Sequence, residues 1–244
     1  MPRGGARLTE IAIAYDVGSL EDAIALDARL GPGPELAKVG LELFTAAGPE
    51  AVRALTRRGR RVFLDLKLHD IPNTVRGAAA AAARLSAELL TVHAMGGGEM
   101  LRAAVEGAAE GGGGTGVIAV TVLTSIDASN APPGFASPLE PGLVVPRLLE
   151  LAERSGARGI VCGVPDLEGL RRTHPAPFFA VTPGIRPAGV APHDQKRVAT
   201  LADAVRAGSS LAVLGRAVTA APDPRAALEA ARAERDAAAA LARR

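Results

Sequence analysis

The sequence predicts a single α/β domain built as a (β/α)8 barrel, the TIM-barrel architecture. Eight short apolar runs alternate with longer Ala- and Leu-rich segments along the 244 residues. Strands separated by helices indicate a parallel sheet, and strands this apolar are typical of a sheet covered on both faces. The length also suits one barrel of this type. A doubly wound open sheet is the structural alternative.

The expected strands are the short apolar runs, at Ile11–Asp16, Leu36–Gly40, Arg61–Lys67, Leu89–His93, Gly116–Val122, Gly159–Cys162, Phe178–Val181 and Leu211–Leu214. The expected helices are the Ala- and Leu-rich segments, at Ser19–Leu30, Pro49–Arg58, Thr74–Ser86, Met100–Glu110, Val144–Ser155, Leu167–Thr173 and Asp194–Ala207. A final helix that frays is expected from Pro222 onward.

No domain boundary is predicted, so residues 1–244 are expected to form one catalytic domain. Gly111–Gly114 is a flexible connector that is too short to be an interdomain linker. The Pro-rich segment Asn130–Gly142 is expected to be a surface excursion after the fifth strand.

Composition excludes several function classes. Aromatic residues make up only 2% of the chain, so the core must be aliphatic and stacking of nucleic-acid bases is nearly unavailable. The basic residues are scattered and the net charge is +2, which also argues against a nucleic-acid partner. Cys162 is the only cysteine, so neither an intrachain disulfide nor a multi-thiolate metal site can form. The N-terminal residues lack the apolar core of a signal peptide, and no apolar run is long enough for a membrane span. We therefore expect a cytoplasmic protein.

Polar residues gather where the expected strands end, which in a βα barrel is the rim that carries the chemistry. These residues are Asp16, Lys38, Asp65, Lys67, His93, Thr124, Arg186 and Arg216. Their repetition around the barrel favours a functional site there.

The third expected strand carries the most informative segment. Side chains alternate between the faces of a strand, so Asp65 and Lys67 should both point toward the barrel axis, with Asp70 just beyond the strand end. Two carboxylates beside one ammonium would keep the lysine charged and raise its pKa, which suits a proton donor better than a Schiff-base nucleophile. A strand-end salt bridge without catalytic function is the alternative interpretation.

The motif Asp65-x-Lys67-x-x-Asp70-Ile-Pro-Asn-Thr74 resembles the signature of the orotidine 5′-phosphate decarboxylase family. Further landmarks follow in that family's order along nearly the whole chain. They are Asp16, Lys38-Val-Gly, Val92-His-Ala-Met-Gly-Gly, Val120-Thr-Val-Leu-Thr124-Ser, Thr182-Pro-Gly-Ile-Arg186 and Gly215-Arg216. Tyr15 departs from the aliphatic residue that is more usual in the family, which puts the packing beside Asp16 in doubt.

The resemblance implies that the chain converts orotidine 5′-phosphate to UMP as a homodimer with shared active sites. It implies that Lys67 protonates C6 of the pyrimidine, that Asp65 lies beside the departing carboxylate, and that Asp70 reaches into the partner's site. Asp16, Lys38 and Thr74 would bind the ribose region, and Thr124 would lie near the base. Phosphate would be held by Arg186, Gln195, Gly215 and Arg216.

The segment Pro183–Gln195 is expected to be an irregular lid over the phosphate, with a disordered surface loop as the alternative. Gly215-Arg216 is expected to open the last helix, whose exposed N–H groups would favour an anion. No dinucleotide fingerprint or multi-residue metal motif is present, so neither a cofactor nor a metal is expected, although pyridoxal phosphate and a bound ion stay open. His69, His93, His174 and His193 have no metal-ligand spacing, and Cys162 is expected to be a buried small side chain.

Two other functions remain as alternatives. A sugar-phosphate decarboxylase or aldolase of the same superfamily would share the Asp-x-Lys-x-x-Asp pattern and would usually use magnesium. A non-catalytic nucleotide-binding barrel would need a damaged Asp65, Lys67 or Asp70, and all three are present.

Overall fold

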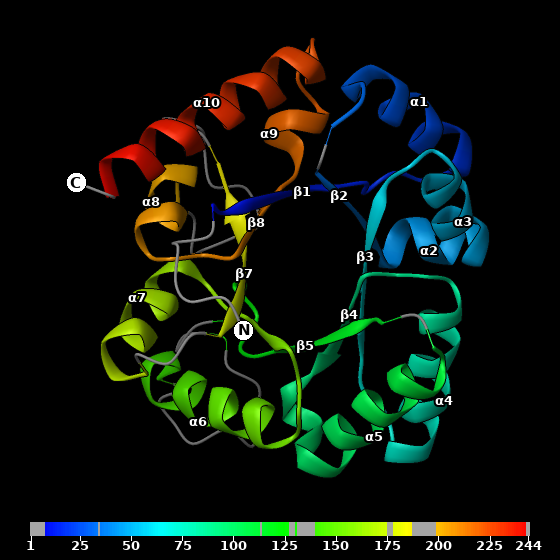
Figure 1. Cartoon of the computed structure of the whole chain (residues 1–244), viewed down its shortest axis with the longest axis vertical. Coiled ribbons are helices and arrows are strands. Elements are labelled where there is room, and N and C mark those ends of the chain that lie inside the picture. The colour runs from blue at the N-terminus through cyan, green and yellow to red at the C-terminus, as the bar shows by residue number, and fades with distance from the viewer. Residues whose placement is uncertain are drawn as a thin grey trace.

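A computed structural model shows a closed barrel of eight parallel strands in sequential order, ringed by helices (Figure 1). It describes residues 8–33, 35–112, 114–126, 130, 140–174, 178–186 and 199–242. β1 pairs with β2 on one side and with β8 on the other, so the sheet has closed on itself. The predicted barrel is therefore confirmed, and the open doubly wound sheet is excluded.

The strands are β1 Glu10–Ala14, β2 Leu36–Gly40, β3 Arg61–Leu68, β4 Leu89–His93, β5 Gly116–Val120, β6 Gly159–Val161, β7 Phe179–Ile185 and β8 Leu211–Leu214. The helices of the described residues are α1 Leu20–Leu30, α2 Leu41–Ala47, α3 Pro49–Arg57, α4 Pro72–Arg84, η1 Ala94–Gly96 (a 3-10 turn), α5 Gly97–Glu110, α6 Pro141–Arg154, α7 Val164–Thr173, α8 Leu201–Arg206, α9 Arg216–Thr219 and α10 Pro224–Ala242. None of these helices has the length and apolar content needed to cross a membrane.

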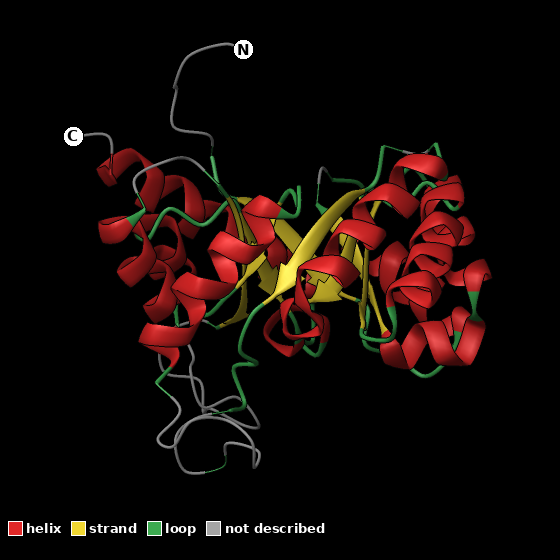
Figure 2. Cartoon of the chain, turned by 90° about the horizontal axis from the view of Figure 1, so that it is seen from below, coloured by secondary structure: helices red, strands yellow, loops and turns green. Residues whose placement is uncertain are grey.

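Two hydrophobic clusters explain why the strands are apolar on both faces. A small cluster fills the barrel interior, and it includes Leu36, Phe63 and Leu89. A much larger one, mostly Ala, Val, Leu and Ile, joins the strands to the helices. Figure 2 shows these helices packed around the outside of the strands. Because each strand is buried on both sides, its sequence shows a continuous apolar run in place of an alternating pattern.

Several expected element ends were wrong. β1 ends at Ala14 and β5 at Val120, so Asp16 and Val122 lie in the loops that follow. β7 extends to Ile185, where Ile185 pairs with Leu214 beyond a shift in register, and Gly184 supports this irregularity with a φ of 77°. The expected lid therefore begins as strand, and its residues 187–195 lie outside the described residues.

Several helices also begin at residues other than the expected ones. Four helices begin earlier than expected, and three of them carry a proline in the first turn, where the missing N–H costs nothing. The helix expected at Asp194–Ala207 begins only at Leu201, because Thr200 and Asp203 form a capping box. The short helix α2 was not expected. Gly215-Arg216 opens the four-residue α9 and not the last helix. The last helix begins at Pro224, after Asp223, whose carboxylate accepts backbone N–H groups.

The last helix is tied to the barrel by an ion pair. α10 packs against α1, α8 and α9, and its Arg232 donates two hydrogen bonds, of 2.6 and 2.7 Å, to the carboxylate of Glu35, the residue before β2. The Glu35 side chain is only 3% exposed. Burial alone would raise the pKa of Glu35, but the hydrogen bonds and charge of Arg232 bring that pKa below its usual range.

We expect Arg232→Met to lower the free energy of unfolding by about 2 kcal/mol at neutral pH, because it leaves the Glu35 carboxylate buried without its cation. A depressed carboxyl pKa stabilises the fold above the unfolded pKa, and this contribution is lost as pH falls through the folded pKa. The difference in the free energy of unfolding between the variant and the wild type should therefore become smaller in acid. Urea unfolding at successively lower pH measures both effects.

Arg225→Met is the matched control on the same helix, because Arg225 pairs with the exposed Glu229 and such surface pairs contribute little. Equal losses of stability in the two variants would contradict the anchoring role of Arg232.

Candidate active site

A cavity of about 900 Å³ opens at the carboxyl ends of the strands. Eight of the expected site residues line it, namely Asp16, Lys38, Asp65, Lys67, Thr124, Arg186, Gly215 and Arg216. Asp70 and Thr74 are exposed and do not line the cavity of their own chain. Gln195 lies outside the described residues.

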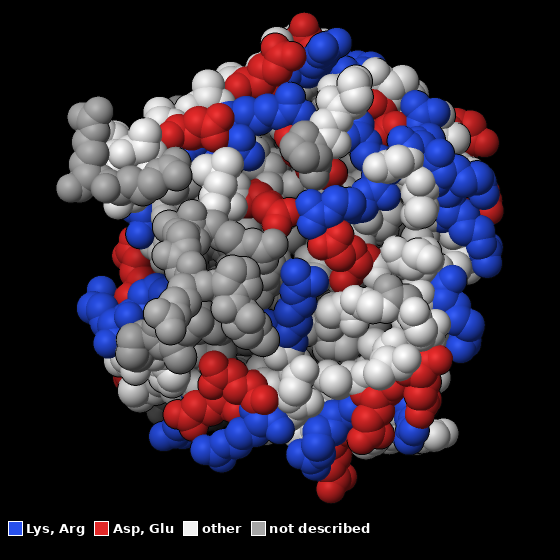
Figure 3. All heavy atoms as spheres, viewed as in Figure 1, with Lys and Arg blue, Asp and Glu red and all other residues white. Residues whose placement is uncertain are grey.

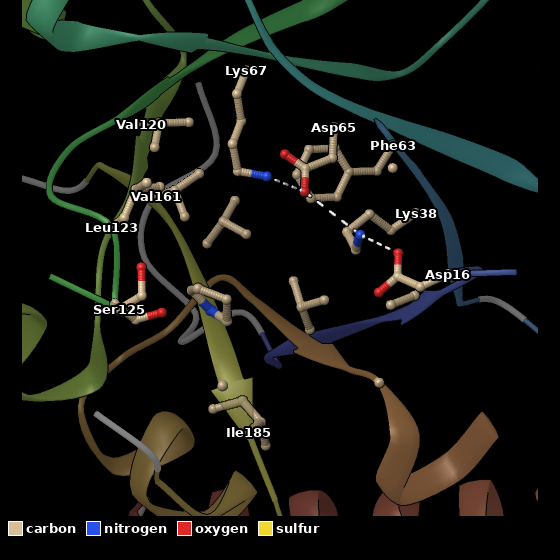
Figure 4. A pocket seen from close by; sticks show the side chains of 18 of the residues that line it. Asp16, Lys38, Phe63, Asp65, Lys67, Val120, Leu123, Ser125, Val161 and Ile185 are labelled. Carbon is tan, nitrogen blue, oxygen red and sulfur yellow. Dashed lines mark hydrogen bonds and ion pairs between the residues drawn. The ribbon is translucent and has the colours of Figure 1, made fainter. Parts of the chain in front are cut away.

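Four charged side chains form an alternating row across one wall of the cavity (Figure 4). The Lys67 Nζ lies 2.8 Å from Asp65 Oδ2, and the Lys38 Nζ lies 3.5 Å from the same oxygen. Lys38 also lies 3.0 Å from Asp16 Oδ1. The row therefore runs Asp16, Lys38, Asp65, Lys67, with its two middle members more buried than its two ends.

Strand register explains why the row forms. β2 pairs with β3 so that Gly40 is opposite Asp65, which places Lys38 beside the carboxylate. A Cβ on Gly40 would lie 3.0 Å from both Asp16 Oδ1 and Lys38 Nζ. Gly40 therefore leaves the space through which the Lys38 ammonium reaches its partners.

Asp65 is the buried centre of this row, with its side chain 12% exposed. Burial alone would raise the pKa of Asp65, but the charges of Lys38 and Lys67, with hydrogen bonds from Lys67 and Thr91, lower that pKa below its usual range. The carboxylate is therefore ionised at neutral pH. Its negative charge attracts both ammonium groups and so holds Lys38 and Lys67 at the wall of the cavity.

The expectation that two carboxylates flank Lys67 is not met within one chain. Asp65 is there, but the Asp70 carboxylate instead accepts the backbone N–H of Ile71 at 2.6 Å and is exposed to solvent. Within one chain it is Asp65 that lies between two ammonium groups.

Lys67 departs from regular strand geometry. Its φ is 48°, one of the two positive values at non-glycine residues in the described part of the chain. The β3–β4 pairing also shifts register between Leu64 and Leu68. Its backbone N–H is satisfied by Thr91 Oγ1 at 2.8 Å, and the same hydroxyl lies 2.9 Å from Asp65 Oδ1. Asp65 and Lys67 share the inner face, as alternation predicts, and both lie in the stretch where the pairing is irregular.

Two features of the site were not predicted from the sequence. They are Thr91 and an apolar wall of the cavity formed by Val120, Leu123 and Val161. A signal for Thr91 existed, because it is a polar residue in the middle of the mainly apolar strand β4 and alternates with Leu89 and His93 on the inward face. Val120, Leu123 and Val161 lie near Lys67, across from Asp65 (Figure 4). All three are aliphatic, as ordinary core residues are, so the sequence pattern does not identify them as residues that line a site.

The structure also places the residues for which no catalytic role was expected. The rings of His69 and His93 are 5.4 Å apart, and burial, with His69 and Lys67, lowers the pKa of His93. Tyr15 is buried, and its hydroxyl donates to Asp27 at 2.9 Å, which resolves the doubt about local packing. Cys162 is buried directly after β6 and borders the cavity.

Neither a metal cluster nor a basic stripe is found among the residues that the structure describes. The described residues contain no group of three His, Cys, Asp or Glu side chains that could hold a metal ion. Over most of the face shown in Figure 3, Lys and Arg lie next to Asp and Glu. This agrees with the scattered basic residues of the sequence.

Comparison with known proteins links this cavity to one family. The model of the "Orotidine 5'-phosphate decarboxylase / HUMPS family" matches residues 9–231. An orotidine 5′-phosphate decarboxylase of Anaeromyxobacter sp. (strain K) is 53% identical over 222 residues, which cover 90% of this chain and 95% of the relative. That of Halorhodospira halophila is 49% identical over 225 residues, covering 92% and 94%. The crystal structure of the Lactobacillus acidophilus enzyme has a TM-score of 0.82 at 37% identity and covers 94% of this chain and all of that one.

We expect the Asp65 carboxyl group to titrate below the usual range of aspartate, because two ammonium groups outweigh its burial. Replacing Lys38 by Met should raise this midpoint, since it removes one of the two charges. The ¹³C shift of the Asp65 carboxyl carbon, assigned with Asp65→Asn and followed against pH, measures both values. A midpoint above the usual range in the wild type would mean that burial dominates.

Proposed function

This chain belongs to the orotidine 5′-phosphate decarboxylase / HUMPS family, and on that premise we propose that it decarboxylates orotidine 5′-phosphate to UMP in pyrimidine biosynthesis. The observation that carries the proposal is the ammonium of Lys67, held 2.8 Å from the buried Asp65 beside an apolar wall. The catalytic residues of the proposal are Lys67, Asp65 and Asp70.

The chemistry requires a fixed cation at C6. When the bond between C6 and the carboxylate carbon breaks, CO2 leaves and the electron pair stays on C6, where the pyrimidine ring offers no easy delocalisation. The Lys67 ammonium stabilises that charge and then donates a proton to C6, giving UMP, and the neutral amine regains a proton from solvent. Asp65 holds the ammonium in place through their 2.8 Å contact. No electron-sink cofactor enters the scheme.

The cavity has a suitable size and polarity for a nucleotide. Its volume of about 900 Å³ lies within the range of small-molecule sites. Asp16 and Lys38 would bind the ribose region, and Thr124 would lie near the base. Arg186 and Arg216 line the cavity at the ends of β7 and β8, where they would bind the phosphate with the Gly215 backbone and Gln195. The arginine charges carry most of this role, because α9 has only four residues.

The proposed assembly is a homodimer with shared sites. Asp70 and Thr74 are exposed outside their own cavity, and Ile71 beside them is 67% exposed. Met95, in the 3-10 turn η1 that follows β4, is 42% exposed. A second copy that covers these apolar side chains would bring Asp70 and Thr74 toward the partner's Lys67. We place the enzyme in the cytoplasm, without a nucleic-acid partner.

The alternatives have less support. The curated relatives that are 46–53% identical carry the decarboxylase name, and no observation favours a sugar-phosphate enzyme over them. A non-catalytic barrel would not require the complete charged row that contains Asp65 and Lys67.

We expect wild-type protein to remove the ultraviolet absorbance band of orotidine 5′-phosphate, at a rate that EDTA does not change. Lys67→Ala should abolish this turnover while UMP binding, followed by calorimetry, is largely retained. The phosphate and ribose contacts do not involve the removed amine. Near-normal turnover by the variant would contradict the role of Lys67. Inhibition by EDTA would favour the magnesium-dependent sugar-phosphate chemistry.

Mixing Asp70→Ala and Lys67→Ala subunits should restore part of the activity that each variant lacks alone. In a mixed dimer one of the two sites has an intact lysine and receives an intact Asp70 from the other chain. Subunit exchange should be verified by native mass spectrometry before the assay. Verified mixed dimers without activity would argue against a shared site and leave the decarboxylase assignment untouched.

A further inference from the structure

The hydroxyl of Thr91 contacts Asp65 and Lys67, two of the three proposed catalytic residues. Thr91 lies in the middle of β4, and its exposed fraction is 0%. Its Oγ1 lies 2.8 Å from the backbone nitrogen of Lys67 and 2.9 Å from Oδ1 of Asp65. Thr91 itself is absent from the residues that line the cavity.

The direction of each hydrogen bond follows from the groups involved. A backbone N–H can only donate, so Oγ1 accepts from Lys67. A carboxylate can only accept, so the single hydroxyl proton of Thr91 points to Asp65 Oδ1. This leaves Asp65 Oδ2 for the ammonium groups of Lys67 and Lys38. One hydroxyl thereby sets the rotation of the Asp65 carboxylate.

The same hydroxyl compensates for the irregular backbone at Lys67. With a φ of 48° and a shift in the β3–β4 register, Lys67 lies in a strained conformation for a residue with a side chain. Thr91 supplies a side-chain acceptor for its N–H at this irregular part of the ladder, and a buried N–H without a partner would be costly. The backbone position from which the lysine side chain extends therefore depends on Thr91.

We infer that Thr91 is a positioning residue for the decarboxylation, one that sets the distance between the Lys67 ammonium and the reacting carbon without contacting the substrate. The inference rests on the proposed function. Catalysis by a fixed charge depends steeply on position, and displacements of about 1 Å can cost about 100-fold in rate. Loss of the hydroxyl should therefore lower kcat more than it weakens nucleotide binding.

The test compares Thr91→Val with Thr91→Ser. Valine keeps the branched shape and removes the hydroxyl, whereas serine keeps the hydroxyl and removes a methyl group. We expect Thr91→Val to lower kcat for orotidine 5′-phosphate by about tenfold to about 100-fold. KM and the Kd for UMP should change by less than about threefold, and Thr91→Ser should recover kcat to within about threefold of wild type.

Thr9→Val is the matched control. Thr9 is also buried, and its hydroxyl donates to the Ser209 carbonyl at 2.8 Å, away from the cavity. It should lose stability to an extent comparable with Thr91→Val in thermal unfolding but keep the wild-type kcat. A fall in kcat of the same size in both valine variants would overturn the inference, because it would reflect general destabilisation.

Three further results would also overturn the inference: wild-type kcat in folded Thr91→Val, a rise in KM that matches the fall in kcat, or no rescue by serine. Should Thr91→Val not fold, Thr91→Ala against Thr91→Ser makes the same comparison, since both lack the methyl group and differ only in the hydroxyl. Equal kcat values in that pair would refute the positioning role. Wild-type protein assayed in parallel separates these results from failure of the decarboxylase assignment, which would appear as no conversion by the wild type.

Discussion

One buried carboxylate, shared by two ammonium groups, organises the candidate site. Asp65 would be unfavourable in the barrel interior as a lone charge, and Lys38 and Lys67 would repel each other there without it. The mutual dependence of these three groups accounts for features that lie some way from the chemistry. A Cβ on Gly40 would crowd the Lys38 ammonium and the Asp16 carboxylate, and Thr91 donates to the second carboxylate oxygen of Asp65.

The charged row borders an apolar wall, and the contrast between them has a physical consequence. A charge acts more strongly on a reacting atom when aliphatic side chains limit the access of water. Val120 and Val161 provide such surroundings near the Lys67 amine. The barrel interior thus combines a small apolar floor, mostly aliphatic and including Phe63, with a polar rim.

The sequence was sufficient to predict the barrel, the inward direction of Asp65 and Lys67, and the presence of Asp16 and Lys38 near them, because these follow from strand alternation and from the rim rule for βα barrels. The role of Thr91 was not predictable, since it depends on a register shift between β3 and β4. The early helix starts and the extension of β7 to Ile185 depend on proline and glycine geometry at particular positions. Asp70 shows a different limit, because the contact proposed for it is with a second copy of the chain.

Closure of the sheet between β1 and β8 has a consequence for biosynthesis. While the ribosome is still making the chain, β1 has no neighbour on one side until residues 211–214 have emerged. An unpaired strand edge invites association with other chains. Nascent or prematurely terminated polypeptides that end before β8 should therefore be the aggregation-prone species of this protein, and the ones that most need a chaperone.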